Sequence, residues 1–294
     1  MDTMPAPAAP ATAAPPLRWT VYRHRLPVRI THWINVVCMT VLLGSGLSIF
    51  NAHPHLYWGE QSDFDRPLLE IVALRGADGQ YHGAVRVGAH RFDTDGVLGV
   101  STGPSGKPQA RAFPTWATLP GPQNLALGRK WHFTFAWLLA INGAAYLLWA
   151  LGSGHLRRDL APTQADWRGF GRSLVDHALL RHPQGEQATR YNVLQKLAYL
   201  AVIGVLAPGM LLTGLAMSPH FDPVMGWLLD LLGGRQSART VHFIFAFALL
   251  AFVAIHLFEL LVAGAVNHVR SMLTGWYDVP GGRDAERPVE EATR

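Results

Sequence analysis

The chain has 294 residues, of which 49% are hydrophobic and only 15% are charged. Charged residues make up about a quarter of an ordinary soluble domain, so this composition excludes that class. The formal net charge is +5, but the arginines cluster beside apolar segments, a pattern typical of membrane orientation and not of phosphate binding. We therefore expect a membrane protein with no nucleic-acid partner. The single cysteine, Cys38, excludes an internal disulfide.

Four apolar segments contain no Asp, Glu, Lys or Arg. They cover residues 30–50, 131–151, 197–218 and 241–258. A helix needs about twenty residues to cross the hydrocarbon core of a bilayer. The fourth segment reaches that length because it continues as apolar sequence past Glu259. The sequence therefore predicts an all-α membrane protein, built as a four-transmembrane-helix bundle.

The arginines predict the orientation of the spans. Four arginines precede the first span and six lie between the second and third, whereas the loop between the third and fourth has only Arg235 and Arg239. Because Lys and Arg are enriched in cytoplasmic loops, both termini are predicted to be cytoplasmic. Residues 1–20 are predicted as a disordered cytoplasmic tail that lacks the apolar stretch of a signal peptide, and 276–294 as a second cytoplasmic tail. Residues 21–275 are predicted as the transmembrane domain.

The loop between the first two spans, 51–130, is predicted to be a periplasmic insertion. Its stretches RGADGQYHG and HRFDTDGVLG are punctuated by Gly and Asp, which favours short hairpins and turns over helix. A connector would explain it, but an exposed segment of this length favours the docking of a partner. Short helices are expected at 223–232 and in the loop around 167–180.

Four histidines lie in three of the four spans: His32, His132, His242 and His256. The last two are fourteen residues apart, which places them within about 40° of one helix face and about 21 Å apart along the axis. An ionisable residue at such depth indicates a functional site. Since neighbouring spans run in opposite directions, depth pairs His132 with His242 in an outer layer and His32 with His256 in an inner one.

Two bis-histidine haems spanning the bilayer are the leading interpretation of this arrangement. Bis-histidine ligation fills both axial positions of the iron, so such haems transfer electrons and do not bind oxygen. A transporter for zinc or another metal is the main alternative, although transport sites converge at the midplane and recruit carboxylates. Basic residues that border the two layers are candidates to pair with haem propionates or simply orient the membrane: Arg23, Arg25, Arg29, Arg129 and Lys130.

The sequences around these histidines are RLPVRITHWIN, LGRKWHFTFAW and RTVHFIFAFALLAFVAIH. They resemble the bacterial di-haem cytochrome b family, which includes cytochrome b561 and the cytochrome b subunits of nickel–iron hydrogenases and membrane-bound formate dehydrogenases. The resemblance covers most of residues 21–275. It implies two non-covalent b-type haems with these four histidines as iron ligands, a quinone as electron carrier, and a location in the bacterial inner membrane.

Two further segments extend the resemblance. RYNVLQKLAY is similar to the formate dehydrogenase subunits, which implies a quinone site at Asn192, with Gln195 and Lys196 close by. Asn192 and Gln195 share a helix face and can bind a quinone carbonyl, but Asn192 can instead cap its helix. Glu259 is expected either to relay protons to the quinone or only to mark the interface. FPTWATLPGPQNLALGRKWHF resembles members that work with a periplasmic molybdopterin oxidoreductase.

The function expected from this resemblance is respiratory electron transfer between the membrane quinone pool and a periplasmic redox enzyme, with a molybdopterin oxidoreductase as the expected partner. Substrate chemistry is then expected to belong to the partner and not to this chain. A stand-alone quinone-reducing oxidoreductase of the same fold, such as a superoxide oxidase, is the alternative within the family. A non-redox metal transporter is the alternative outside it.

Overall fold

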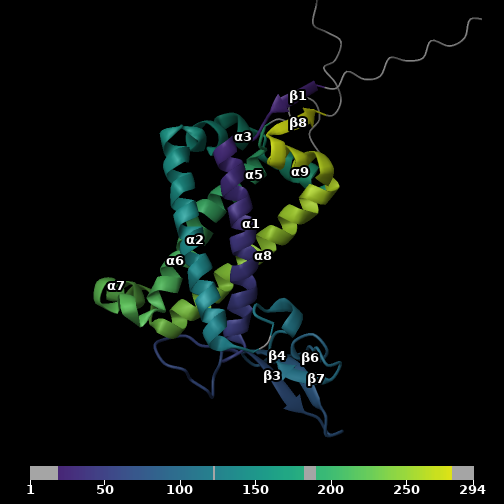
Figure 1. Ribbon diagram of the computed structural model, residues 1–294, viewed down its shortest axis with the longest axis vertical. Coiled ribbons are helices and arrows are strands. Elements are labelled where there is room, and N and C mark those ends of the chain that lie inside the picture. The colour runs from purple at the N-terminus through teal and green to yellow at the C-terminus, as the bar shows by residue number, and fades with distance from the viewer. Residues whose placement is uncertain (1–18, 122, 182–189, 280–294) are drawn as a thin grey trace, which may run out of the picture.

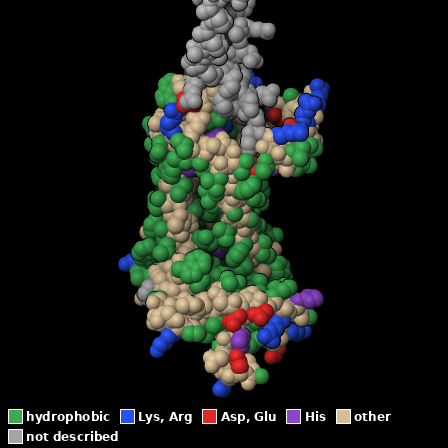
Figure 2. All heavy atoms as spheres, turned by 90° about the vertical axis from the view of Figure 1, so that its right-hand side faces the viewer, with side chains coloured by type: hydrophobic (Ala, Val, Ile, Leu, Met, Phe, Trp, Pro, Cys, Tyr) green, Lys and Arg blue, Asp and Glu red, His purple; other side chains and the backbone are tan. Residues whose placement is uncertain are grey.

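The computed structural model describes residues 19–121, 123–181 and 190–279, and these are mostly helical. It confirms the four predicted spans, each extended by a few residues at one or both ends. They are α1 (Leu26–Phe50), α2 (Leu125–Gly152), a third helix over Val193–Ala216, and α8 (Arg235–Val262). On the face that Figure 2 shows, apolar side chains cover the middle of the molecule and most charged ones lie toward its two ends. This is the distribution that a bilayer requires.

The spans pack as two pairs, α1 with α2 and α6 with α8 (Figure 1). The third span consists of α5 (Val193–Ala201), one π-helical stretch (Val202–Leu206) and α6 (Ala207–Ala216). Pro208 explains the interruption, because proline has no N–H to donate and its ring clashes with the carbonyl four residues earlier. The sequence segment 197–218 did not reveal this break.

One end of the bundle, which we call the outer end, carries the insertion between α1 and α2. The insertion forms one antiparallel sheet in the order β2-β3-β4-β5 and a separate hairpin of β6 and β7. This confirms the predicted hairpins. The strands are β2 (His55–Leu56), β3 (Leu69–Arg75), β4 (Tyr81–Val87), β5 (His90–Asp93), β6 (Gly99–Thr102) and β7 (Pro108–Arg111), followed by the 3-10 helix η1 (Thr115–Ala117).

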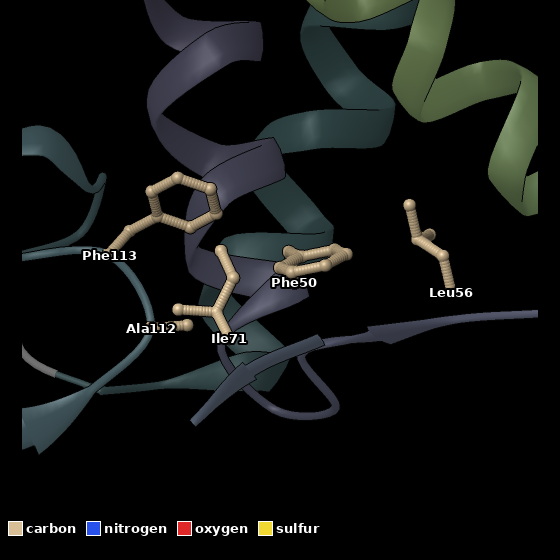
Figure 3. Close-up of a cluster of buried hydrophobic side chains, with 5 residues drawn as sticks. All are labelled: Phe50, Leu56, Ile71, Ala112 and Phe113. Carbon is tan, nitrogen blue, oxygen red and sulfur yellow. The ribbon is translucent and has the colours of Figure 1, made fainter. Parts of the chain in front are cut away.

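A buried apolar cluster fastens the insertion to the end of α1 (Figure 3). Phe50, the last residue of α1, lies with Leu56, Ile71, Ala112 and Phe113. The next residue along the chain adds polar contacts, because the Asn51 side chain donates to the Phe113 carbonyl at 3.2 Å and accepts from the Phe113 N–H at 2.7 Å. The sheet is therefore held firmly against the spans.

The outer end also holds η5 (Pro219–Phe221) and α7 (Asp222–Leu232), which confirms the short helix expected at 223–232. Gly233 and Gly234 both have positive φ, at 76° and 111°, and turn the chain sharply into α8. A Cβ on Gly234 would lie 2.6 Å from the backbone of Gly59 and Glu60. Only glycine therefore allows the insertion to approach the start of α8 this closely.

The opposite end, the inner end, is formed by short elements around the two described chain ends. They are the π-helix η2 (Leu156–Leu160), α3 (Gln164–Arg168), α4 (Phe170–Ala178) and α9 (Ala265–Thr274). Helices α3 and α4 confirm the helical structure expected around 167–180.

A strand pair at the inner end corrects the predicted tail boundaries. Strand β1 (Trp19–Tyr22) pairs with β8 (Trp276–Val279) in antiparallel register, Tyr22 opposite Trp276. Residues 19–20 and 276–279 are thus part of the fold and not of the tails, because each strand supplies the backbone hydrogen bonds that the other lacks. The predicted tails beyond them, 1–18 and 280–294, lie outside the described residues.

Candidate functional site

The four span histidines lie as two pairs of edge-on rings between the two pairs of helices. The ring centres of His132 and His242 are 6.3 Å apart, and those of His32 and His256 are 6.4 Å apart. These are the two pairs that the sequence predicted from the depth of each histidine along its span. Each pair joins α8 to the α1–α2 side of the bundle, so a group held between the rings would bridge the two helix pairs.

The spacing of the rings fits a metal ion held between two imidazoles. A metal–imidazole nitrogen bond is about 2.0–2.1 Å long, and a ring nitrogen lies about 1.1 Å from the ring centre, so two trans imidazoles have centres about 6.3 Å apart. Both pairs match this value, and both have the same interplanar angle of 62°. Direct packing of two neutral imidazole rings would require neither this spacing of the ring centres nor equal interplanar angles in the two pairs.

Two hydroxyl groups orient the outer histidines. The Ser45 hydroxyl donates to the Val41 carbonyl at 2.6 Å and lies 3.0 Å from Nδ1 of His132. Likewise, Thr213 donates to the Gly209 carbonyl at 2.7 Å and lies 2.9 Å from Nδ1 of His242.

These contacts determine the tautomer of both outer rings. A hydroxyl has one proton, and here its own helix accepts it, so each hydroxyl must accept the Nδ1 proton of its histidine. The Nε2 lone pair of each ring is then free to bind a metal, as in other histidine sites whose second nitrogen is hydrogen-bonded.

The inner pair is positioned by aromatic packing instead. Phe252, one turn before His256 on α8, stacks on its ring at 6.1 Å with an interplanar angle of 12°. The Trp33 ring contacts His32 edge-on at 5.3 Å. Nδ1 of His32 is buried and has no hydrogen-bond partner among the described residues. The two layers therefore differ in what holds the ligand rings.

All four histidines line one cavity of about 2210 Å³. Ordinary small-molecule pockets measure roughly 300–1,000 Å³, so this cavity has room for more than one large prosthetic group. Glycines shape it close to the outer pair. A Cβ on Gly46 would lie 3.4 Å from the His132 ring, and one on Gly214 would lie 3.5 Å from the His242 ring.

The other span glycines serve different purposes. Gly44 and Gly209 allow close packing, because a Cβ there would collide with Leu119 at 2.8 Å and Phe245 at 2.2 Å. Gly143 and Gly204 face open space.

The basic residues named from the sequence separate into two groups. Arg23 and Arg129 line the cavity, whereas Arg25, Arg29 and Lys130 are absent from its lining. Arg29 donates to the Leu273 carbonyl. The sequence placed Arg239 only among the loop arginines and not at the site, but it lines the cavity and donates to the His53 carbonyl at 2.5 Å.

His24 at the inner end was also missed. It is buried, lines the cavity beside Arg23, and its Nδ1 has no hydrogen-bond partner among the residues described. Burial, together with the neighbouring charge of Arg23, lowers the pKa of His24 to about 4. A neutral His24 ring and the unpartnered Nη1 of Arg23 are donors suited to a carboxylate such as a haem propionate.

Asn192 and Gln195 cap the start of α5 and also line the cavity. The Asn192 side chain accepts from the Gln195 N–H at 2.8 Å, and the Gln195 side chain accepts from the Asn192 N–H at 3.2 Å. This reciprocal capping box occupies the carbonyl oxygen of each side chain. Their amide NH₂ groups are the atoms left to donate to a ligand.

The remaining candidates at the inner end contact ionisable side chains of neighbouring helices. Lys196 is buried and contacts Asp166 at 2.8 Å. Burial alone would raise the pKa of Asp166, but hydrogen bonds from Lys196 and Thr163 outweigh it and lower that pKa. Glu259 lies 3.4 Å from His177 of α4. Lys196 therefore ties α5 to the α3 turn, and Glu259 ties α8 to α4.

The positions of the metal-binding types of side chain disfavour the alternative of a metal transporter. Within 19–121, 123–181 and 190–279, no group of three or more His, Cys, Asp or Glu side chains is placed to hold a metal ion. Two separate histidine pairs cannot complete a tetrahedral site. They can supply the two axial ligands of a haem, whose macrocycle provides the other four bonds to iron.

Comparison with known proteins identifies the family. The model of the prokaryotic cytochrome b561 family matches residues 23–275. The chain belongs to this family. It is therefore a membrane b-type cytochrome that binds haem and transfers electrons.

Two relatives show the range of similar proteins. A putative protein-methionine-sulfoxide reductase subunit, YedZ1, from Azospira oryzae is 30% identical over 236 residues, which cover 78% of this chain and 85% of the relative. A probable Ni/Fe-hydrogenase B-type cytochrome subunit from Cupriavidus necator is 25% identical over 177 residues, 54% of this chain and 72% of the relative. No solved structure matches the chain. Both relatives are named as subunits of redox enzymes.

Proposed function

We propose that the protein is a transmembrane di-haem cytochrome b that passes electrons between the membrane quinone pool and a periplasmic redox enzyme. The observation that carries this proposal is the geometry of the two histidine pairs, whose ring centres lie 6.3 and 6.4 Å apart in two layers. His132 and His242 would hold the outer haem, and His32 and His256 the inner one. Haem iron with two imidazole ligands exchanges electrons only, so the pair forms a conduit across the membrane.

The absorption spectrum of the purified protein tests the haem assignment. Reduced wild-type protein should show split b-type bands from two haems. Replacing His32 by Ala should remove one haem and leave the outer one spectrally intact, because Ser45 and Thr213 still orient the outer ligands. Loss of the outer haem alone from this variant would overturn the pairing, and a wild-type protein without b-type bands would overturn the haem proposal.

A redox enzyme on the periplasmic side is proposed as the partner, docking on the insertion 51–130. Supporting this, both relatives are named as subunits of redox enzymes, one of them a methionine-sulfoxide reductase. The resemblance of residues 113–133 to family members that serve molybdopterin oxidoreductases favours that class of partner. The proposal places the chain in the bacterial inner membrane with both termini cytoplasmic, so that the outer end faces the periplasm.

A quinone site is proposed beside the inner haem, at the start of α5. The supporting observations are that Asn192 and Gln195 line the same cavity as His32 and His256 and retain free amide NH₂ groups. Asn192→Ala should slow electron exchange between haem and quinone while leaving the haem spectrum unchanged. Asn192→Ser is the control, because serine keeps the helix cap and lacks the amide.

The two variants separate binding from capping. If Asn192 binds quinone, both should be slow in haem reoxidation by a quinone analogue, measured by stopped-flow absorbance. A slow Ala variant with a normal Ser variant would show that Asn192 only caps the helix. Unaltered kinetics in both would move the site elsewhere in the cavity.

A further inference from the structure

A second buried histidine lies at the inner end of the cavity, outside the haem-ligand pairs. His155, where α2 gives way to the π-helix η2, directs Nδ1 at Oδ2 of Asp159 over 2.5 Å. The His155 side chain is only 9% exposed, whereas the Asp159 side chain is 45% exposed. The carboxylate therefore faces solvent, and the imidazole that it contacts is buried. Nε2 remains as the ring atom free to exchange a proton with a ligand in the cavity.

The surroundings of His155 lead toward the inner histidine layer. Its ring contacts Trp149 at 5.1 Å and Tyr146 at 6.5 Å, both on α2. Tyr146 is fourteen residues from His132, the same separation as between His242 and His256. At a constant rise per residue, Tyr146 thus lies close to the depth of the inner pair. His155 and Tyr146 both line the cavity that His32 and His256 line.

An aromatic row near this position leads from Tyr191, just before α5, to His256 on α8. Tyr191 contacts Tyr199 at 5.5 Å, Tyr199 contacts Phe252 at 6.5 Å, and Phe252 stacks on His256 at 6.1 Å. Burial raises the pKa of Tyr191, so its hydroxyl stays protonated. Aromatic walls with a few polar groups are the usual environment for a flat ligand head group.

We propose that Asp159 and His155 carry protons from the cytoplasm to a quinone head group, a 1,4-diketone ring, held in the inner part of the cavity. This inference rests on the proposed quinone function. Conversion of the quinone to its hydroquinone takes two electrons, supplied through the inner haem from the reduced partner, and two protons, which convert each C=O to C–OH. Asp159 takes a proton from the aqueous phase, Nδ1 of His155 receives it, and Nε2 releases its own proton toward the quinone, directly or through the Tyr146 hydroxyl. The proton left on Nδ1 must move to Nε2, by rotation of the ring, before the second proton follows the same path.

The other charged groups around His155 are basic or already engaged. On its own element, Arg158 donates to the Ser153 carbonyl. From α5, Lys196 is bound to Asp166, and the facing tyrosines are Tyr191 and Tyr199. Arg23 lies over the Tyr191 ring at 5.9 Å. Asp159 is thus the acid that links this part of the cavity to the aqueous phase.

The His177–Glu259 pair is the competing route, because it also lies at the inner end and lines the cavity. Its two side chains are 36% and 25% exposed, so neither is withdrawn from solvent as His155 is. A carboxylate that reaches solvent, in contact with an imidazole that is buried, favours Asp159 and His155 as the proton path. Glu259 joins two helices and does not need to move a proton for that role.

The experiment uses the haem-loaded full chain in lipid nanodiscs, reduced and then mixed with a short-chain ubiquinone analogue. Haem reoxidation and proton uptake are followed together by stopped flow, the latter with a pH-indicator dye. Asp159→Asn and His155→Gln should slow both signals about tenfold or more, since a positioned proton-transfer group contributes at least that much. Asp78→Asn is the matched control: Asp78 also pairs with a histidine four residues away, at 3.0 Å, but at the outer end.

Rescue by a small acid distinguishes proton transfer from a structural role. Azide or formate should restore the rate of Asp159→Asn toward that of wild type and leave the wild-type and Asp78→Asn rates unchanged. A wild-type rate in Asp159→Asn, or a slow rate that neither acid restores, would overturn the relay while the quinone function stands. If quinone fails to reoxidise the wild-type haems at all, the quinone function itself is wrong, and the relay with it.

Discussion

The hydroxyls of Ser45 and Thr213 join residues that are far apart in sequence. Ser45 contacts a histidine 87 positions away and Thr213 one 29 positions away. No local pattern marks such partners, so the sequence did not predict them. It did single out the four histidines as candidate ligands, because an ionisable residue inside an apolar span is conspicuous and helical geometry sets its depth. Ligand candidates could thus be found from sequence, but not the groups that orient them.

We expect Ser45→Ala to weaken the outer haem selectively. Without the Ser45 hydroxyl as acceptor for its Nδ1 proton, His132 becomes a less basic and less firmly oriented ligand, and losses of this kind cost about 10–100-fold in metal affinity. The outer haem should dissociate more readily to apomyoglobin, and its reduction potential should rise because the oxidised iron loses more stabilisation than the reduced iron. Spectropotentiometry and transfer kinetics measure the two effects.

Ser48→Ala is the control for this substitution. Ser48 lies on the same helix and is equally buried, but its hydroxyl has no hydrogen-bond partner among the described residues. It should leave both haems unchanged. Equal effects of the two substitutions would mean that the loss of a buried hydroxyl from α1, and not the contact with His132, determines haem binding.

At the scale of elements, the sequence predicted what depends on local pattern. The four spans, the short helix at 223–232 and the turn-rich insertion were predicted because composition and periodicity mark them directly. The pairing of β1 with β8 was not, since two strands of four residues 254 positions apart have no local signal. The π-helical stretch at Val202–Leu206 was also missed, although Pro208 just after it is a recognisable helix breaker.

The insertion provides a test of partner docking. Deleting residues 73–106 removes the last three residues of β3 and all of β4, β5 and β6. It spares all five residues of the buried cluster, Phe50, Leu56, Ile71, Ala112 and Phe113. Because that cluster holds the rest of the insertion to α1, both haems should stay bound, whereas electron exchange with the partner should fall sharply. Haem spectra and partner reduction kinetics measure this. A normal exchange rate in the deletion variant would make the insertion only a connector.

The hairpin of β3 and β4 should lose stability as the pH rises above neutral. His82 lies 3.0 Å from both Asp95 and Asp78, and the hydrogen bonds to these carboxylates, Asp95 first, raise the pKa of His82. A raised folded-state pKa stabilises the fold at pH values below 6.5, and the effect disappears as the pH rises through the folded value. Hydrogen bonds to the backbone and to His82 lower the pKa values of both aspartates. The stability of the hairpin therefore also decreases at strongly acid pH, where the aspartates become protonated.

Hydrogen exchange of residues 78–96, corrected for the intrinsic pH dependence of exchange, measures this effect. Wild-type protein should show faster hairpin opening at pH 8 than at pH 6. His82→Gln keeps a hydrogen-bonding side chain but cannot be charged, so its opening should not differ between these two pH values. The same pH profile in both proteins would show that His82 does not govern the hairpin.

At the scale of the whole molecule, the direction of the proposed electron transfer depends on which end of the bundle faces the periplasm. The outer end carries the insertion and the inner end carries the β1–β8 pair, α3 and α4 (Figure 1). A partner at one end and a quinone with its proton supply at the other would make electron transfer cross the membrane. The proposed function therefore requires that the outer end faces the periplasm and the inner end faces the cytoplasm.

Cysteine labelling tests this orientation directly. The single native cysteine, Cys38, is fully buried and should not react with a membrane-impermeant maleimide. We expect Ser105→Cys, in the exposed turn between β6 and β7, to react in intact cells from the periplasmic side. Arg168→Cys, exposed at the end of α3, should react only after the inner membrane is opened. The reverse pattern would place the insertion in the cytoplasm, and a periplasmic partner could then not reach it.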